Sequence, residues 1–310
     1  MHDHDWQTLP IEMVSPGNRR AALDLLLQDL DAISRQCEIQ RLLVLLQSQT
    51  PEQAVLLGVI QGSEVRGVSL VHLHPGHVAT IWPPSVRWTD DELGERLAVA
   101  AADLARHRGA AFAQAQLAVD EVREKTWLEK ANLCHVADIE CLLWLPLPSD
   151  RSEDVPIPSN LSLERYVHPA QRGRLEPLLA QTWIDTLDCT ALEGMRNAAD
   201  ALDNYLAAGD SGAEHWYFLR GGGQDAGCLL LAEHRETDEM ELVYMGLAPP
   251  WRGQGLGHVL TRCAQKLTRR ADRACLTTAV DTANLLARAV YQAAGLVACE
   301  RRQVLLLRFV

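Results

Sequence analysis

The segment WRGQGLG, residues 251–257, gathers three glycines and one arginine directly before an amphipathic stretch. The residues before it, MELVYMGL (240–247), have the composition of a β-strand, which Pro249 and Pro250 cannot extend. The segment is therefore expected at a helix N-terminus, where unpaired N–H groups and the helix dipole attract anions. Glycine lets the main chain approach a ligand closely, and the guanidinium of Arg252 matches phosphate geometry. This glycine turn, as we call residues 251–257, is predicted to bind a pyrophosphate.

Two common phosphate-binding patterns do not fit the glycine turn. The sequence lacks the GxxxxGK[ST] pattern of a P-loop, and the dinucleotide fingerprint GxGxxG would need glycine at the position of His258. The pattern present is Arg-x-x-Gly-x-Gly, at residues 252, 255 and 257. The alternative is a turn whose glycines only bring helix and strand together.

The sequence YMGLAPPWRGQGLG (244–257) resembles the acetyl-CoA-binding motif of the GNAT superfamily of N-acetyltransferases, in which a strand and a proline-containing turn precede an [RQ]xxGx[GA] loop. A second segment, NLLARAVYQAAGL (284–296), resembles the next helix of that family. The resemblance implies an acyltransferase with acetyl-CoA as cosubstrate and no metal. The cosubstrate-binding residues that it implies are Met245, Gly246, Leu247, Arg252, Gly253, Gln254, Gly255, Leu256, Gly257, Asn284 and Ala287.

Two further side chains are candidates for acid–base chemistry. An amine of pKa ~10.4 must lose its proton to attack, which costs roughly 4–5 kcal/mol near neutral pH, so a general base helps. The resemblance implies that Glu241 is this base, directly or through water, and that Tyr291 is the acid that protonates the departing thiolate. The period of two predicts that Glu241 shares a strand face with Val243 and Met245. The alternatives are an exposed strand carboxylate for Glu241 and a tyrosine packed against the sheet for Tyr291.

The acceptor is expected to be the primary amine of a small molecule. The segment WIDTLDCTALEGM (183–195) carries Asp185, Asp188 and Glu193, which would suit a cationic amine, but a solvated connection between helices would also explain them. Cys189 is expected to be structural, because no histidine lies near it in the sequence. The alternative function is a non-catalytic acyl-CoA-binding sensor or interaction module.

The elements that must position these residues alternate between strand and helix periodicity. In the second half we expect strands at 161–167, 214–221, 225–234, 239–247, 274–280 and 296–309, and helices at 169–183, 195–208, 255–270 and 282–294. In the first half we expect strands at 53–61, 64–74, 77–82, 110–118 and within 133–145, and helices at 89–107 and 119–131. Together with the resemblance, this order predicts an α/β fold with a mixed, mostly antiparallel sheet flanked by helices.

The chain has the marks of a duplicated domain. A shift of 153 positions superimposes Val14 on Val167, Pro16 on Pro169 and Arg19 on Arg172. Between the halves, PLPSDRSEDVPIPSN (146–160) carries four prolines and is the best linker in the chain. We therefore expect two tandem GNAT-like domains, 1–147 and 161–310, joined by a linker at 148–160, an organisation similar to that of mycothiol synthases.

The first half differs at the position of the glycine turn. Its segment RWTDDELGER (87–96) places Asp90, Asp91 and Glu92 there, and carboxylates cap a helix but repel a pyrophosphate. The helix that follows, within DEVREKTWLEKANL (120–133), lacks asparagine and tyrosine at the positions of the second motif. The first half is therefore expected to be a degenerate domain without the CoA motif.

Composition limits the partners. The net charge of −12 and the pI near 5.4 speak against nucleic acid, which requires a basic face. The eight cysteines form no CxxC pair and indicate a reduced, cytoplasmic protein. The sequence has neither a signal peptide nor a long apolar run, so no membrane association is expected. We expect a monomer or homodimer.

Overall fold

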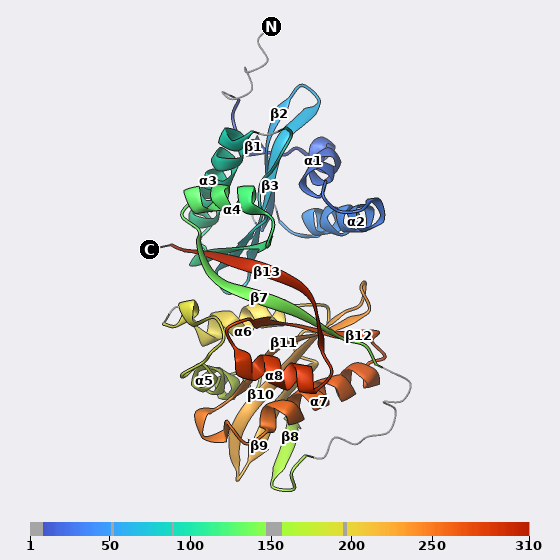
Figure 1. Cartoon of the computed structure of the whole chain (residues 1–310), viewed down its shortest axis with the longest axis vertical. Helices are drawn as coiled ribbons and strands as arrows, with labels where there is room; N and C mark the ends of the chain where they lie inside the picture. The colour runs from blue at the N-terminus through green and yellow to red at the C-terminus, as the bar shows by residue number, and fades with distance from the viewer. Residues whose placement is uncertain (1–8, 51–52, 89, 147–156, 195–196, 310) are drawn as a thin grey trace. The chain divides into compact units, whose positions relative to one another are not determined.

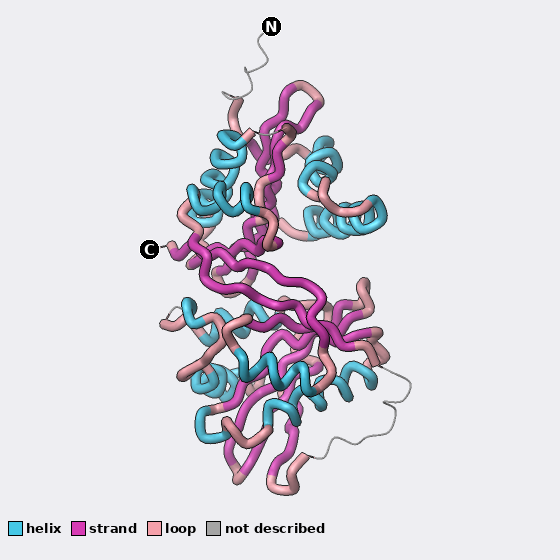
Figure 2. The backbone as a smooth tube through the Cα atoms, in the orientation of Figure 1, coloured by secondary structure: helices cyan, strands magenta, loops and turns pink. Residues whose placement is uncertain are grey.

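The computed structural model describes residues 9–50, 53–88, 90–146, 157–194 and 197–309 (Figure 1). The chain divides into two compact units, one of Met1–Val136 with Gln303–Val310 and one of Ala137–Arg302. In both units, helices flank the strands (Figure 2). The expected mixed, mostly antiparallel sheet with flanking helices is confirmed.

The second unit is built on a sheet that is buried on both faces. Its strands β8 to β12 are neighbours in chain order, and β12 is followed by β7 (Cys134–Trp144) and then β13 (Val297–Arg308). The pairs β8–β9, β9–β10, β10–β11 and β12–β7 are antiparallel, and β11 pairs with β12 in parallel. The five strands are β8 (Leu161–Arg165), β9 (His215–Gly221), β10 (Gln224–His234), β11 (Glu239–Leu247) and β12 (Cys275–Asp281).

Alternate residues of β10 show how the helices cover this sheet. Leu229 and Leu231 belong to the hydrophobic cluster of α7 (Leu256–Arg270) and α8 (Leu285–Ala293). Cys228 and Leu230 belong to the cluster of α5 (Arg172–Thr182) and α6 (Ala198–Leu206). A strand that is buried on both sides needs no polar alternation, which explains the uninterrupted apolar run in its sequence.

The first unit repeats this plan. Its strands are β1 (Glu12–Met13), β2 (Ala54–Gln61), β3 (Glu64–His74), β4 (Val78–Ile81) and β6 (Phe112–Ala118), in that order, and the short β5 (Ser85–Val86) pairs with β3. One core cluster belongs to α1 (Arg19–Leu26) and α2 (Ala32–Ser48), and the other to α3 (Asp91–His107) and α4 (Val122–Lys130). The helices α1 and α5 begin at Arg19 and Arg172, the pair that the shift of 153 positions aligns.

The two halves of the sequence exchange strand segments. The strand β7 (Cys134–Trp144) belongs to the first half, but its residues 139–144 pair with β12, and Leu142 and Trp144 are buried in the second unit. The strand β13 (Val297–Arg308) belongs to the second half, but its Leu305 is buried in the core of the first unit. The compact units therefore divide the chain differently from the expected boundary. Most of the expected linker, residues 147–156, lies outside the described residues.

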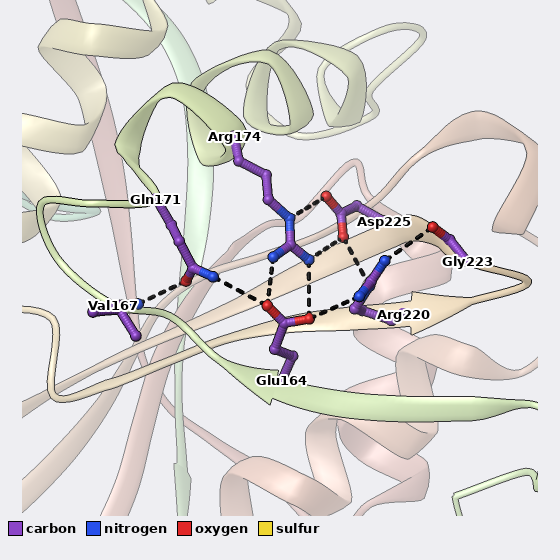
Figure 3. Close-up of polar contacts among 7 residues, drawn as sticks. All are labelled: Glu164, Val167, Gln171, Arg174, Arg220, Gly223 and Asp225. Carbon is purple, nitrogen blue, oxygen red and sulfur yellow. Dashed lines mark hydrogen bonds and ion pairs between the residues drawn. The ribbon is translucent and has the colours of Figure 1, made fainter.

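A charge network attaches α5 to the sheet of the second unit (Figure 3). Nε of Arg174 lies 2.7 Å from Oδ2 of Asp225, and Nη2 lies 3.3 Å from Oε2 of Glu164. Arg220 of β9 also donates to Glu164, at 3.0 Å. Hydrogen bonding from Arg174 lowers the pKa of Glu164 to about 2, so this carboxylate stays ionised at ordinary pH. The network thereby fixes the helix whose last residue, Thr182, reaches the glycine turn.

Candidate active site

The glycine turn joins β11 to α7 through a 3-10 turn at Pro249–Trp251. Gly253 and Gly255 have φ values of +71° and +75°, in the left-handed region that strongly favours glycine. Gly257 has no such requirement, and a Cβ atom there would meet the Val290 methyl groups at an ordinary 3.6 Å. Backbone conformation therefore explains two of the three glycines.

The main chain of the glycine turn presents a row of N–H groups. The helix α7 begins after Gly255 without a side-chain cap, and the N–H of His258 donates to the Gly255 carbonyl at 3.1 Å. Among the described residues, no hydrogen bond uses the N–H groups of residues 253–257. Five successive donors at the positive end of a 15-residue helix form a ready site for an anion.

The side chain of Arg252 donates to three main-chain carbonyls, and its contact with a pyrophosphate stays a prediction. Its Nε donates to the carbonyl of Leu247 at 3.1 Å, and Nη2 donates to the carbonyl of Thr182 at 3.0 Å. A longer contact of 3.4 Å joins Nη1 to the carbonyl of Asp185. The guanidinium thus connects the end of β11 to the C-terminus of α5, where helix carbonyls lack partners within the helix.

We expect Arg252→Ala to lower the free energy of unfolding by about 1–3 kcal/mol, because it leaves part-buried carbonyls without donors. Thermal or urea unfolding in the absence of any ligand measures this loss. Arg270→Ala, an exposed change at the end of the same helix, is the matched control and should stay within about 0.5 kcal/mol of the original chain. Equal stability of the two variants would contradict the structural role of Arg252.

The strands β11 and β12 separate in front of the glycine turn. Their parallel register covers only Glu239–Glu241 with Cys275–Thr277. Beyond this branch point, β11 stays paired with β10 as far as Leu247, while β12 stays paired with β7 as far as Asp281. The edge of β11 from 242 to 247 therefore has no register partner in β12, and an extended ligand with amide groups could pair with such an edge.

A β-bulge changes the faces of β11. Leu230 pairs with Tyr244 and Leu231 with Leu242, so Val243 is the extra residue. Leu242 and Met245 consequently both lie in the α7–α8 cluster, although they are three residues apart. The prediction that Glu241 shares a face with Met245 is wrong, because the bulge shifts the alternation by one residue. Glu241 shares its face with Tyr244, on the side of α5 and α6.

Glu241 lies at the branch point and has a partner that the sequence analysis missed. Its side chain is 39% exposed, and Oε2 is 2.7 Å from Nε2 of His234, the last residue of β10. The hydrogen bond with Glu241 raises the pKa of His234 above its usual value. The sequence held a signal for this contact: the predicted strands 225–234 and 239–247 are close enough to form a hairpin. In that hairpin His234 lies opposite Glu239, two residues from Glu241.

Tyr291 lies on the other face of the sheet at the same branch point. The side chain is 6% exposed and packs in the α7–α8 cluster. Burial raises the pKa of Tyr291, and the negative charge of Asp188 adds to this shift, while a hydrogen bond with Thr278 opposes it. Since Thr278 directly follows the last residue of β12 that pairs with β11, the phenol is close to the branch point and remains protonated at neutral pH.

The residues of the second motif shape the start of α8. Asn284 is the N-cap, and its side-chain oxygen accepts a hydrogen bond from the N–H of Ala287 at 3.1 Å. The preceding Asp281 is buried and accepts hydrogen bonds from the N–H groups of Ala283 at 2.9 Å and Cys189 at 3.1 Å. The acidic segment at 183–195 is thereby attached to the end of β12, four residues beyond the branch point. Its last residue, Met195, lies outside the described residues.

The first unit has the same branch point without the same chemistry. Its β4 and β6 pair in parallel over three residues, from Val78 to Thr80, and Thr80 takes the position of Glu241. Counted from the starts of α4 and α8, Leu128 takes the position of Tyr291.

The helix start in the first unit is already occupied by side chains of that unit. The Asp90 side chain caps α3 by accepting from the Leu93 N–H at 3.0 Å. Asp91 accepts from Arg123 at 2.9 Å and from Nε1 of Trp127 at 3.2 Å. The ring of Trp127 covers Gly94, where an added Cβ atom would lie 2.4 Å from it. The carboxylates at this helix start therefore serve the fold.

Among the described residues, no group of three or more histidine, cysteine or acidic side chains is arranged to hold a metal ion. None of the described helices combines the length and the apolar character that crossing a bilayer requires.

Part of the sequence matches a known protein family. Residues 182–296 match the model of the acetyltransferase (GNAT) family. No curated protein matches the sequence of the chain.

Solved structures agree in fold. A GCN5-related N-acetyltransferase from Sphaerobacter thermophilus is 15% identical, with a TM-score of 0.65 and 97% of both chains covered. A tandem GNAT protein from the clavulanic acid biosynthesis pathway is 14% identical, with a TM-score of 0.57 and 97% and 98% covered. The glucosamine N-acetyltransferase region of a fungal multi-domain β-N-acetylglucosaminidase is 13% identical, with a TM-score of 0.67, and the match covers 97% of this chain and 38% of that one. Residues 182–296 thus match the acetyltransferase (GNAT) family, and the chain as a whole shares the fold of solved GNAT proteins, one of them a tandem GNAT protein.

Proposed function

We propose that the protein is an acetyl-CoA-dependent N-acetyltransferase that moves the acetyl group directly to the primary amine of a small molecule. The observation that carries this proposal is the row of unpaired N–H groups at 253–257, located where β11 and β12 have separated. The row suits the pyrophosphate of the cosubstrate, and the free edge of β11 at 245–247 suits its pantetheine amides. Asn284 and Ala287 support the same site by shaping the start of α8.

In this proposal, the base and the acid lie on opposite faces of the sheet at the branch point. On the α5–α6 side, Glu241 accepts the proton that the amine nitrogen loses as the C–N bond forms, directly or through one water molecule. A backbone N–H near Gly246 or Leu247 stabilises the oxyanion of the tetrahedral intermediate. When the C–S bond breaks, Tyr291 on the α8 side donates its proton to the thiolate. The buried position of Tyr291 supports this role, because it keeps the phenol protonated.

We further propose that the first unit does not bind the cosubstrate. Thr80 cannot serve as a base of the same strength as Glu241, and Asp91 would repel a pyrophosphate at the start of α3. Calorimetry should therefore show one acetyl-CoA site per chain. A panel of primary amines, with detection of the released thiol, tests the transfer and identifies the acceptor. Two equivalent sites, or no acetyl-CoA binding, would contradict the proposal.

Gln254→Glu tests the anion site without changing its shape. The Gln254 side chain is exposed and makes one contact, with the Pro250 carbonyl at 2.9 Å. A carboxylate there would repel the pyrophosphate, and we expect the acetyl-CoA Kd to rise at least about tenfold, or 1.4 kcal/mol. Gln292→Glu, the same change at an exposed position of α8, should leave the Kd unchanged. Equal Kd values for both variants would remove the glycine turn from the binding site.

A further inference from the structure

The contact between His234 and Glu241 connects the proposed base to a second titratable group. The two side chains come from adjacent antiparallel strands, and their 2.7 Å contact uses one oxygen of the carboxylate, Oε2. No described hydrogen bond uses the other oxygen, Oε1, while the His234 side chain is 33% exposed and open to exchange with solvent. Glu241 therefore has one oxygen held by the imidazole and one available to a substrate.

The groups around His234 are acidic. Glu241 and Glu239 face it from β11, and Asp210 faces it from the loop between α6 and β9. The next residue, Arg235, donates its main-chain N–H to Asp210 and its side-chain Nε–H to Glu233. This environment favours the imidazolium, and the hydrogen bond with Glu241 is the largest cause of the raised pKa of His234.

The first unit supplies a comparison. His74 occupies the end of β3 as His234 occupies the end of β10, and its Nε2 lies 2.9 Å from Oγ1 of Thr80. Thr80 holds the position of Glu241, so both units connect the histidine at the end of the hairpin strand to the residue at the branch point. With a hydroxyl as partner, burial dominates and the pKa of His74 is lowered. Of these two equivalent contacts, only the one in the second unit, which carries the glycine turn, joins the histidine to a carboxylate.

We propose that His234 is a positioning residue that controls Glu241: as an imidazolium it holds the carboxylate in an ion pair, and as a neutral imidazole it orients Oε2 and leaves Oε1 basic. This inference rests on the proposed function. In the neutral form, the Nε2–H still donates to Oε2, while Oε1 takes the proton from the amine nitrogen as the C–N bond forms. In the charged form, the positive charge lowers the proton affinity of the carboxylate, and transfer slows.

The first test measures the contact itself and needs no turnover. In NMR titrations of the imidazole nitrogens, His234 should titrate above 6.5, and Glu241→Gln should move its pKa back toward 6.5. The spectrum of His234→Gln identifies the resonance. If the pKa of His234 is the same with and without the Glu241 carboxylate, the ion pair does not form and the inference is overturned.

The second test measures control of the reaction. The kcat/KM of His234→Gln is divided by the kcat/KM of the original chain at each pH. Because both chains use the same amine, its ionisation affects both values equally and does not change this ratio. Glutamine keeps an N–H donor but carries no charge, so the ratio should be constant well above the His234 pKa and about tenfold higher than that plateau one pH unit below the pKa. His107→Gln, an exposed change in the first unit, should give a ratio near one at every pH.

The outcomes separate the two proposals. A ratio that does not change with pH, in a chain that does acetylate an amine, would make His234 merely structural and overturn this inference alone. If the original chain acetylates no amine although it binds acetyl-CoA, the proposed function is wrong and the inference fails with it.

Discussion

Neither half of the chain is expected to fold when residues 1–146 and 157–310 are produced separately. The second fragment loses the partner of β12 at residues 139–144 and, with it, the buried side chains of Leu142 and Trp144. Removing a buried leucine and a buried tryptophan costs about 5–10 kcal/mol in total, which is comparable to the entire stability of a domain. The first fragment loses the fully buried Leu305 and leaves β6 without the neighbour that β13 provides.

Circular dichroism and size-exclusion chromatography of each fragment measure this effect. Fragments produced together should assemble, because each supplies the strand that the other lacks. A chain beginning at residue 137 is the matched control, since it restores β7 to the second unit and should regain a cooperative unfolding transition. Cooperative unfolding of 157–310 alone, with full acetyl-CoA affinity, would show that the exchanged strand contributes little.

Glu241→Gln is expected to lower turnover by about 10²–10⁴ near neutral pH, the usual contribution of a positioned base. Glutamine keeps the size of the side chain and can still accept the hydrogen bond from His234, but it cannot take a proton from the amine. Activity should recover partly at high pH, where more of the amine has lost its proton without help. The acetyl-CoA Kd should change little, because the carboxylate acts in the transition state.

The matched control is Glu239→Gln, two residues earlier on the same strand, which should change turnover less than about threefold. Tyr291→Phe should also lower turnover but show little recovery at high pH, since the thiolate still lacks its proton donor. A pH–rate profile of the original chain and the three variants decides between these outcomes. If Glu241→Gln is fully active at neutral pH, the base is another group. A non-catalytic acyl-CoA sensor would show no turnover in any of these chains.

Local sequence patterns were sufficient to predict most of the elements. The predicted strand 239–247 matches β11, and the predicted helix 255–270 begins one residue before α7. The duplication was also detectable, because Arg19 and Arg172 start equivalent helices. These features depend on periodicity, glycine and proline, which act within a few residues along the chain.

The features that could not be predicted depend on partners far away in the sequence. The strand β7 reads as the last strand of the first half, and nothing local in its sequence indicates that it pairs with β12. The bulge at Val243 becomes visible only in the register with β10. The contacts of Arg252 join segments about 70 residues apart, whereas its motif position suggested a phosphate ligand.

The contact of Trp127 with Gly94 also constrains the evolutionary history of the first unit. Restoring an anion site at the start of α3 would require the loss of Asp91, which leaves the indole N–H of Trp127 without its acceptor. Replacing the 2% exposed tryptophan to reopen the helix start would leave a cavity that costs about 3–5 kcal/mol. While the tryptophan remains, Gly94 cannot gain a side chain, because a Cβ atom would lie 2.4 Å from its ring. Opening this helix start to an anion would therefore pass through a less stable chain, so Asp91, Gly94 and Trp127 are expected to change together or not at all.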